Sequence, residues 1–290
     1  MKKTLIALAA VAVSSAAMAQ ATIGGTFNVD MQNKISNADN TIGMGDAIVS
    51  VSVSEDLGGG MTASAGTTFQ TKAGRAGTVS NNGYSFALKG GFGALSLVNG
   101  LVGQNEVSAG VSAEDDMSDS LGAYFLRTRL QYALPQIVPG LGIQLRFDQD
   151  GAADTGGIAA VAKVTPSSSN AKFNLDYTIG AGYISYGGLL NAASGGTVYT
   201  GYDFGVAKVD LALTTYDHTE IAITAPLGAN LSAGLHIQTG NYADAIGARV
   251  TYALSKRTAL SFNYVDVTNA SENSTTGAGS NYRVRLSHNF

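Results

Sequence analysis

The sequence predicts an all-β fold, a transmembrane antiparallel β-barrel of about sixteen strands. Three observations predict this class. Segments of about ten residues alternate apolar and polar side chains with a period of two. Charged residues make up only 13% of the chain, against about 25% in ordinary soluble domains, while apolar residues still make up 45%. Clusters of Gly, Asn, Asp and Ser separate the alternating segments, and Gly alone accounts for 37 of the 290 residues.

Composition also excludes several other classes of protein. A disordered chain combines low hydrophobicity with high net charge, and this chain has neither, since its net charge is −4. A transmembrane helix needs an apolar run of about 18 residues or more, and the sequence contains none. The absence of Cys excludes a disulfide framework, a thiolate metal site and a cysteine nucleophile. The slightly acidic charge provides no basic surface for nucleic acid, so we expect no nucleic-acid partner.

Residues 1–19 have the three regions of a secretory signal peptide. Lys2 and Lys3 form a positively charged start, residues 5–13 form a short apolar stretch, and Ala17-Met18-Ala19 provides a small-x-small cleavage pattern. We therefore expect an exported protein whose mature chain begins at Gln20. The remaining residues, 20–290, show no linker and no change in composition, which predicts a single barrel domain.

Alternation is the primary signal for each strand. Val49, Val51 and Val53, for example, alternate with Ser50 and Ser52, so one face of the strand is apolar and the other polar. The predicted strands are 21–32, 46–55, 61–70, 83–89, 92–98, 122–133, 141–148, 157–165, 171–186, 197–204, 206–216, 219–226, 230–238, 242–254, 259–268 and 281–290. The stretch 171–190 can alternatively be divided into two strands.

The predicted connections fall into two classes. Short ones are 90–91, 226–229 and 254–257, whereas long ones are 33–45, 71–82, 99–121 and 268–280. Short turns alternating with long loops are typical of an outer-membrane barrel. A soluble β-sandwich carries Lys and Glu freely on its solvent face, but here the polar face is mainly Ser, Thr, Gly, Asn and Gln. Closing the sheet would turn every apolar face to lipid and pair all backbone groups.

Three segments resemble a known family. Residues 281–290, NYRVRLSHNF, end on Phe290 and resemble the terminal strand of outer-membrane porins. Residues 252–258, YALSKRT, are similar to the penultimate turn of Gram-negative porins of the β-proteobacterial type. Residues 86–97, FALKGGFGALSL, are similar to the turn and strand that lead into the constriction loop of that family.

The resemblance implies a sixteen-stranded homotrimeric general diffusion porin in the outer-membrane lipid. It also implies that the third external loop folds into the channel and that the barrel-assembly machinery recognises the strand ending at Phe290. Two features depart from the family pattern. Residues 97–100, LVNG, replace a Gly-Arg-Gln-like element, and the loop that follows lacks a Pro-Glu-Phe-Gly-Gly-like tip.

Charges collect where a pore constriction is expected. The loop 99–121 carries acidic residues and no basic ones, and the strands after it place arginines on the polar face. An acidic loop opposite arginines creates a transverse field in a narrow aqueous passage. The alternative is a solvated surface loop. The predicted constriction residues are Arg127, Arg129, Arg146, Glu106, Glu114, Asp115, Asp116 and Asp119.

Six further basic residues share the inward face of their strands and are predicted to line the pore: Lys89, Lys172, Lys208, Arg249, Arg283 and Arg285. A basic residue on the lipid face near mid-membrane would cost about 2–4 kcal/mol, which agrees with the inward assignment. The basic wall and the family favour anions, whereas the acidic loop opposes them. Tyr132, Tyr177, Tyr252, Phe262, Tyr264 and Tyr282 suit an interfacial girdle or a trimer interface.

We expect no enzyme, cofactor or metal site. The sequence contains no nucleophile elbow, no zinc-protease motif and no phosphate-binding glycine loop. His236 near Asp210 or Asp244 is the only catalytic pair that can be constructed, and the spacing of Asp115 and Asp116 differs from that of a calcium loop. The sequence therefore predicts a passive channel for small hydrophilic solutes and ions. The alternative is a non-conducting outer-membrane adhesion or structural barrel.

Overall fold

The computed structural model describes residues 20–34, 37–71, 79–102, 125–148, 171–189, 196–215, 218–240, 243–270 and 278–290. These residues form sixteen β-strands. The first eight are β1 (Gln20–Lys34), β2 (Asn37–Gly58), β3 (Met61–Thr71), β4 (Val79–Gly90), β5 (Gly93–Val102), β6 (Phe125–Ala133), β7 (Leu141–Asp148) and β8 (Ala171–Ile179). The others are β9 (Gly182–Leu189), β10 (Gly196–Asp203), β11 (Lys208–Thr214), β12 (His218–Pro226), β13 (Leu231–Gly240), β14 (Ala243–Ala253), β15 (Thr258–Ala270) and β16 (Gly279–Asn289).

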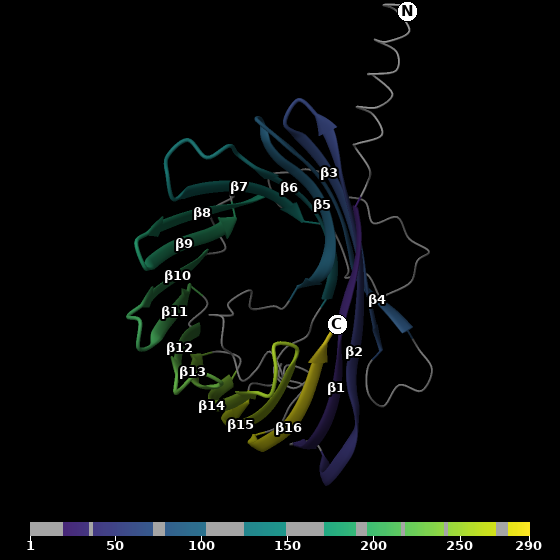
Figure 1. Cartoon of the computed structure of the whole chain (residues 1–290). Coiled ribbons are helices and arrows are strands. Elements are labelled where there is room, and N and C mark those ends of the chain that lie inside the picture. The colour runs from purple at the N-terminus through teal and green to yellow at the C-terminus, as the bar shows by residue number, and fades with distance from the viewer. Residues whose placement is uncertain are drawn as a thin grey trace, which may run out of the picture.

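The strands form one closed antiparallel barrel (Figure 1). Each strand pairs with its neighbours in the chain, and β1 pairs with β16 from Thr26 opposite Asn289 to Asn33 opposite Tyr282. Closure gives each strand a partner on both sides, so the ring has no edge strand. The predicted fold class, an antiparallel barrel of about sixteen strands, is confirmed. No helix in the described part of the chain is long and apolar enough to cross a membrane.

Several predicted boundaries are wrong. The expected long connection 71–82 is too long, because β4 begins at Val79, opposite Thr71. The expected long connection 33–45 lies largely within strands, since β1 and β2 remain paired as far as Lys34 opposite Asn37. The backbone of β1 and β2 stays paired in this polar segment, although its side chains no longer alternate between apolar and polar. The expected single strand 171–186 is two strands, β8 and β9, because Gly180 has a φ of +57° and turns the chain, which favours the alternative division. The expected strand 157–165 lies outside the described residues.

The barrel has an inside-out distribution of side chains. Buried side chains include many polar and charged groups on the inner face, such as Asp210, Glu220 and Asn263, which are each at most 1% exposed. Large apolar side chains on the opposite parity are exposed, for example Ile23, Leu235 and Phe262. A soluble domain buries its apolar groups instead. The core of this fold is therefore the polar interior, and the apolar surface faces outward.

Candidate functional site

The candidate site is the inner wall of the barrel, where the period of two brings polar side chains together. On β6, Arg129 and Gln131 share the inward parity, while Leu130 and Tyr132 lie on the other face. Side chains directly opposite each other on neighbouring strands have Cβ atoms about 4.5–5.5 Å apart, so inward residues of successive strands form continuous rows. These rows place charged side chains of neighbouring strands close together on the inner face of the barrel.

Basic side chains gather on β6, β7 and β8. Arg146 lies directly opposite Gln131 on one side and Lys172 on the other, and it is only 4% exposed. Arg129 lies opposite Asp148. Arg127 is two residues before Arg129 on β6, opposite Gly100, and its side chain lies outside the described residues. The register thus places Arg146 diagonally from Arg129 on the neighbouring strand.

The acidic half of the predicted constriction lies outside the described residues. This applies to Glu106, Glu114, Asp115, Asp116 and Asp119. The predicted loop 99–121 also begins too early, because β5 continues to Val102, opposite Phe125. The Nδ2 of Asn99 donates to Thr128 Oγ1 at 2.9 Å across this pair of strands. The apolar alternation stops at Asn99 and Gly100, but the backbone ladder does not depend on it.

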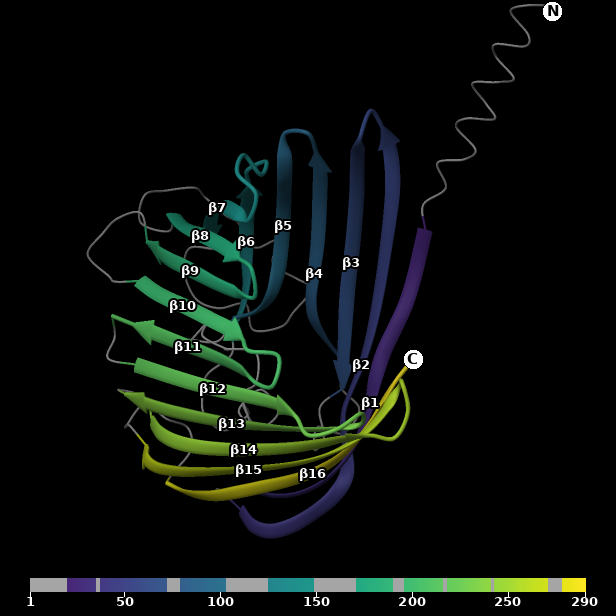
Figure 2. The same ribbon diagram turned by 60° about the vertical axis from the view of Figure 1, so that its left-hand side comes forward.

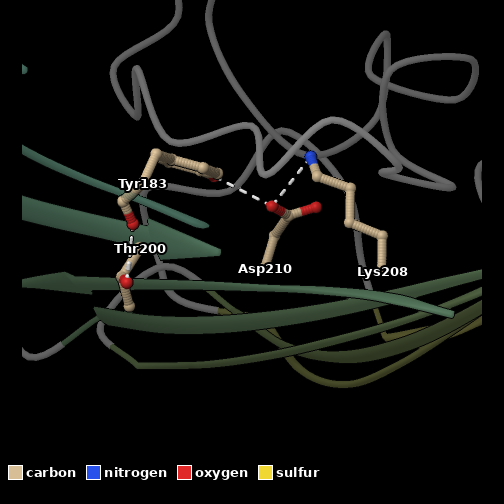
Figure 3. Close-up of polar contacts among 4 residues, drawn as sticks. All are labelled: Tyr183, Thr200, Lys208 and Asp210. Carbon is tan, nitrogen blue, oxygen red and sulfur yellow. Dashed lines mark hydrogen bonds and ion pairs between the residues drawn. The ribbon is translucent and has the colours of Figure 1, made fainter. Parts of the chain in front are cut away.

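A second polar cluster lies on β9, β10 and β11 (Figure 3). The Tyr183 hydroxyl donates to Asp210 Oδ1 at 2.9 Å, and Lys208 Nζ lies 2.9 Å from the same oxygen. Lys208 Nζ also lies 5.5 Å from the centroid of the Tyr183 ring, within the range of a cation–π contact. Thr200 Oγ1 donates to the Tyr183 carbonyl at 2.8 Å, which fixes the backbone that carries the ring.

Gly201 provides the space for this cluster. It lies directly opposite Asp210 on β11 and Tyr183 on β9. A Cβ atom at residue 201 would overlap Asp210 Oδ1 and would lie 2.5 Å from Tyr183 Cε1. The close approach of the carboxylate and the aromatic ring therefore requires glycine between them. Among the cluster residues, Lys208 is one that the sequence predicts to line the pore. The contact between Tyr183 and Asp210, which are 27 residues apart in the sequence, is not predicted.

Asp30 and Arg285 form an ion pair across the β1–β16 seam. Two guanidinium nitrogens of Arg285, Nε and Nη2, each lie 2.7 Å from an Asp30 oxygen. The two residues are directly opposite in the register, and their side chains are 8% and 12% exposed. Such bidentate, charge-assisted bonds are stronger and more directional than single neutral bonds. Arg285, predicted as a lining residue, thus holds the first and last strands together.

The inner face of β12 and β13 carries a buried His–Glu pair. Nε2 of His236 lies 3.6 Å from Oε2 of Glu220, and the two side chains are 3% and 1% exposed. The carboxylate against His236 is therefore Glu220 rather than the Asp210 considered from the sequence, which contacts Tyr183 and Lys208 instead. Glu220 was not singled out as a site residue, although its inward parity on β12 was available as a signal.

The other predicted lining residues lie on separate strands. Arg249 on β14 donates through Nε to Thr251 Oγ1 at 3.1 Å and faces Asn263, which in turn faces the buried Arg283 of β16. Lys89 lies at the end of β4, opposite Thr62. Phe290 follows β16, and its ring stacks on Phe27 at a centroid distance of 5.2 Å. Among the described residues, no group of three His, Cys, Asp or Glu side chains is placed to hold a metal ion.

Comparison with known proteins gives matches at the level of structure. No family model and no curated protein matches the sequence. The anion-selective porin from Comamonas acidovorans has a TM-score of 0.63 at 19% identity, with 94% of this chain and 100% of that chain covered. A triple mutant of the Rhodopseudomonas blastica porin has a TM-score of 0.62 at 14% identity, covering 93% and 100%.

Salmonella typhi OmpF, in a complex with daunomycin, has a TM-score of 0.64 at 12% identity, covering 96% of this chain and 99% of that chain. These likenesses extend over nearly the whole of both chains, so they concern the complete barrel rather than one hairpin. The chain has the fold of the outer-membrane porins, a closed antiparallel barrel of sixteen strands.

Proposed function

We propose that the chain is an outer-membrane general diffusion porin, a passive water-filled channel for small hydrophilic solutes and ions. The observation that carries this proposal is the inside-out distribution of side chains around a closed ring. The outward parity offers lipid an apolar surface, and the inward parity offers water a polar wall with fixed charges. A channel of this kind moves solutes by diffusion, and its function requires no catalytic residue and no cofactor.

Single-channel recording tests this function. The protein, refolded in detergent and added to a planar lipid bilayer, is expected to produce discrete conductance steps that scale with salt concentration. Folding is verified by the shift of the unheated barrel on a denaturing gel. A correctly folded barrel that inserts into lipid vesicles and carries no current would overturn the channel assignment and would favour the adhesion or structural barrel.

The proposed filter is the arginine wall together with the acidic residues of the connection after β5, Glu106, Glu114, Asp115, Asp116 and Asp119. The placement of Arg129 and Arg146 at diagonal positions of the neighbouring strands β6 and β7 supports it, since a low-dielectric wall focuses the field of nearby charges. The double variant Arg129→Gln/Arg146→Gln is expected to shift the reversal potential in a salt gradient toward cations. Lys256→Gln, which removes one charge from a short turn, is the matched control. An unchanged reversal potential in the double variant would contradict this filter.

Three further features follow from the same proposal. The chain is exported by the signal peptide of residues 1–19, so the mature protein recovered from outer membranes is expected to begin at Gln20. It assembles as a homotrimer, which a native gel of the unheated protein tests. The barrel-assembly machinery recognises the strand that ends at Phe290, and the stacking of Phe290 on Phe27 suits a residue that completes the ring.

A further inference from the structure

The seven connections at one end of the barrel, each of two to seven residues, form a continuous rim. They are residues 59–60, 91–92, 134–140, 180–181, 204–207, 227–230 and 254–257, and with Phe290 they are called the short-turn rim. Figure 2 shows that the hairpin turns between β2 and β3, between β4 and β5 and between β14 and β15 lie at this end of the barrel, together with the C-terminus. The rim thus surrounds one mouth of the barrel.

The short-turn rim is almost without charge. Lys256 and Arg257, both in the turn before β15, are the only charged residues among its seven connections. Turns that face water are normally polar. Here Val206 is 78% exposed, Ile137 is 77% exposed and Ile179, immediately before residues 180–181, is 65% exposed. Further exposed large apolar side chains lie within the turns or no more than two residues before them: Leu57, Phe92, Val138, Phe204, Leu227 and Leu254.

The apolar side chains of the rim are continuous with the outward face of the strands. The ring of Phe204 lies 4.7 Å from that of Tyr202, which is on the outward parity of β10. The hydroxyl of Tyr132, on the outward parity of β6, donates to the Phe92 carbonyl at 2.6 Å. These contacts join the rim to the surface that the proposed function assigns to lipid.

The two rim charges are held in a defined turn. Ser255 Oγ accepts the backbone N–H groups of Arg257 at 3.1 Å and Thr258 at 3.0 Å, and the Leu254 N–H donates to the Thr258 carbonyl at 2.9 Å. Leu254 is exposed beside Lys256 and Arg257. An apolar side chain next to two cations suits the boundary where acyl chains meet lipid phosphates, because Lys and Arg place their stems in apolar surroundings and their charges at headgroups.

We propose that the short-turn rim is a lipid-binding surface, which seats the turns in the headgroup and upper acyl region of the adjacent leaflet instead of in water. This proposal rests on the proposed function, since it requires that the barrel spans a membrane. The occupant is lipid because the rim is joined to the outward apolar face at β6 and β10, and because the two charged side chains of its connections are cations. The rim then fixes how deep the barrel sits.

The absence of Trp from the chain makes a direct test possible. Val206→Trp and Leu227→Trp each introduce a single tryptophan into the rim, and Leu235→Trp introduces one on the outward face of β13 as the matched control. Each variant is refolded into phosphatidylcholine vesicles, with folding verified by the gel shift. Two quenchers are compared: phosphatidylcholine brominated on the upper part of its acyl chains, and iodide in the aqueous phase.

Rim tryptophans are expected to have blue-shifted emission, to be quenched by the brominated lipid to an extent similar to the β13 control, and to resist iodide. If both rim tryptophans are quenched by iodide and not by the brominated lipid, while the β13 tryptophan responds to the lipid, the rim proposal is overturned and the membrane barrel stands. If the β13 tryptophan of the folded protein is also quenched only by iodide, the membrane assignment itself fails. Two rim positions are used so that one misfolded variant leaves the test intact.

Discussion

Breaking the ion pair at the β1–β16 seam is expected to destabilise the barrel strongly. Asp30→Asn removes one charge and leaves the Arg285 guanidinium nearly buried on the inner wall, since its side chain is only 12% exposed. Removing one partner of a buried ion pair costs about 3–5 kcal/mol, because the remaining charge loses its bidentate counterion while it stays largely desolvated. The Asn oxygen can still accept one of the two bonds, so we expect about 3 kcal/mol, at the lower end of that range.

A double-mutant cycle separates the ion pair from other effects. Asp30→Asn, Arg285→Gln and the combined variant are unfolded in urea in lipid vesicles, and the folded fraction is measured by the gel shift of the unheated barrel. The combined variant should recover part of the loss, with a coupling energy of about 1–3 kcal/mol. Ser54→Ala, at an exposed position of β2, serves as a control that changes stability by less than about 0.5 kcal/mol. Single losses that simply add in the combined variant would refute the reasoning.

Three other predictions concern space and polarity. Gly201→Ala adds a Cβ against Asp210 and is expected to cost about 1–3 kcal/mol in the same unfolding assay, because close packing leaves no room for it. Gly25→Ala places a Cβ 2.6 Å from Phe290 Cζ, which should reduce the yield of folded barrel on refolding. Leu227→Asp puts a charge on the short-turn rim and should lower the fraction of protein that inserts into vesicles.

Matched substitutions make these predictions decisive. A Cβ atom at Gly228 or at Gly43 would contact nothing within 4 Å, so Gly228→Ala is the control for Gly201→Ala, and Gly43→Ala is the control for Gly25→Ala. Leu227→Asn is polar but uncharged and is the control for Leu227→Asp. Equal stability of the first glycine pair, or equal refolding yields of the second, would contradict the packing argument. Equal insertion of Leu227→Asp and the wild type would count against contact between the rim and lipid.

Side-chain alternation accounts for the part of the fold that could be predicted. A period of two assigns a face to every residue of a strand, which is why Arg146 could be placed on the inner wall from sequence alone. The same signal fails where backbone pairing continues without alternation. Residues 37–45 and 99–102 are therefore predicted as loops, and both are strand. The turn at Gly180 leaves the sequence ambiguous between one strand and two, because apolar alternation resumes directly after it.

Contacts between distant strands could not be predicted. Parity places Asp30 and Arg285 on the inner face, but only the register of the closed ring makes them directly opposite each other. Likewise the approach of Tyr183 to Asp210 depends on the glycine at residue 201 on the strand between them. Such registers depend on hairpin lengths and bulges, including the irregularities of β1 and β2 between Phe27 and Val29 and between Gln32 and Lys34. The face of the strand on which a side chain lies can be inferred from the local sequence. Its partner on the next strand depends on the register of the whole ring.

The closure of β1 on β16 has a consequence for the kinetics of folding. Asp30 and Arg285 are 255 residues apart, so their contact closes a loop of nearly the whole described chain. The length-dependent part of the entropy cost of such a loop, (3/2)RT ln n, is about 5 kcal/mol. A single backbone bond contributes far less than that. The seam should therefore form cooperatively, with its ladder, its ion pair and the Phe27–Phe290 stack appearing together in one late, slow step.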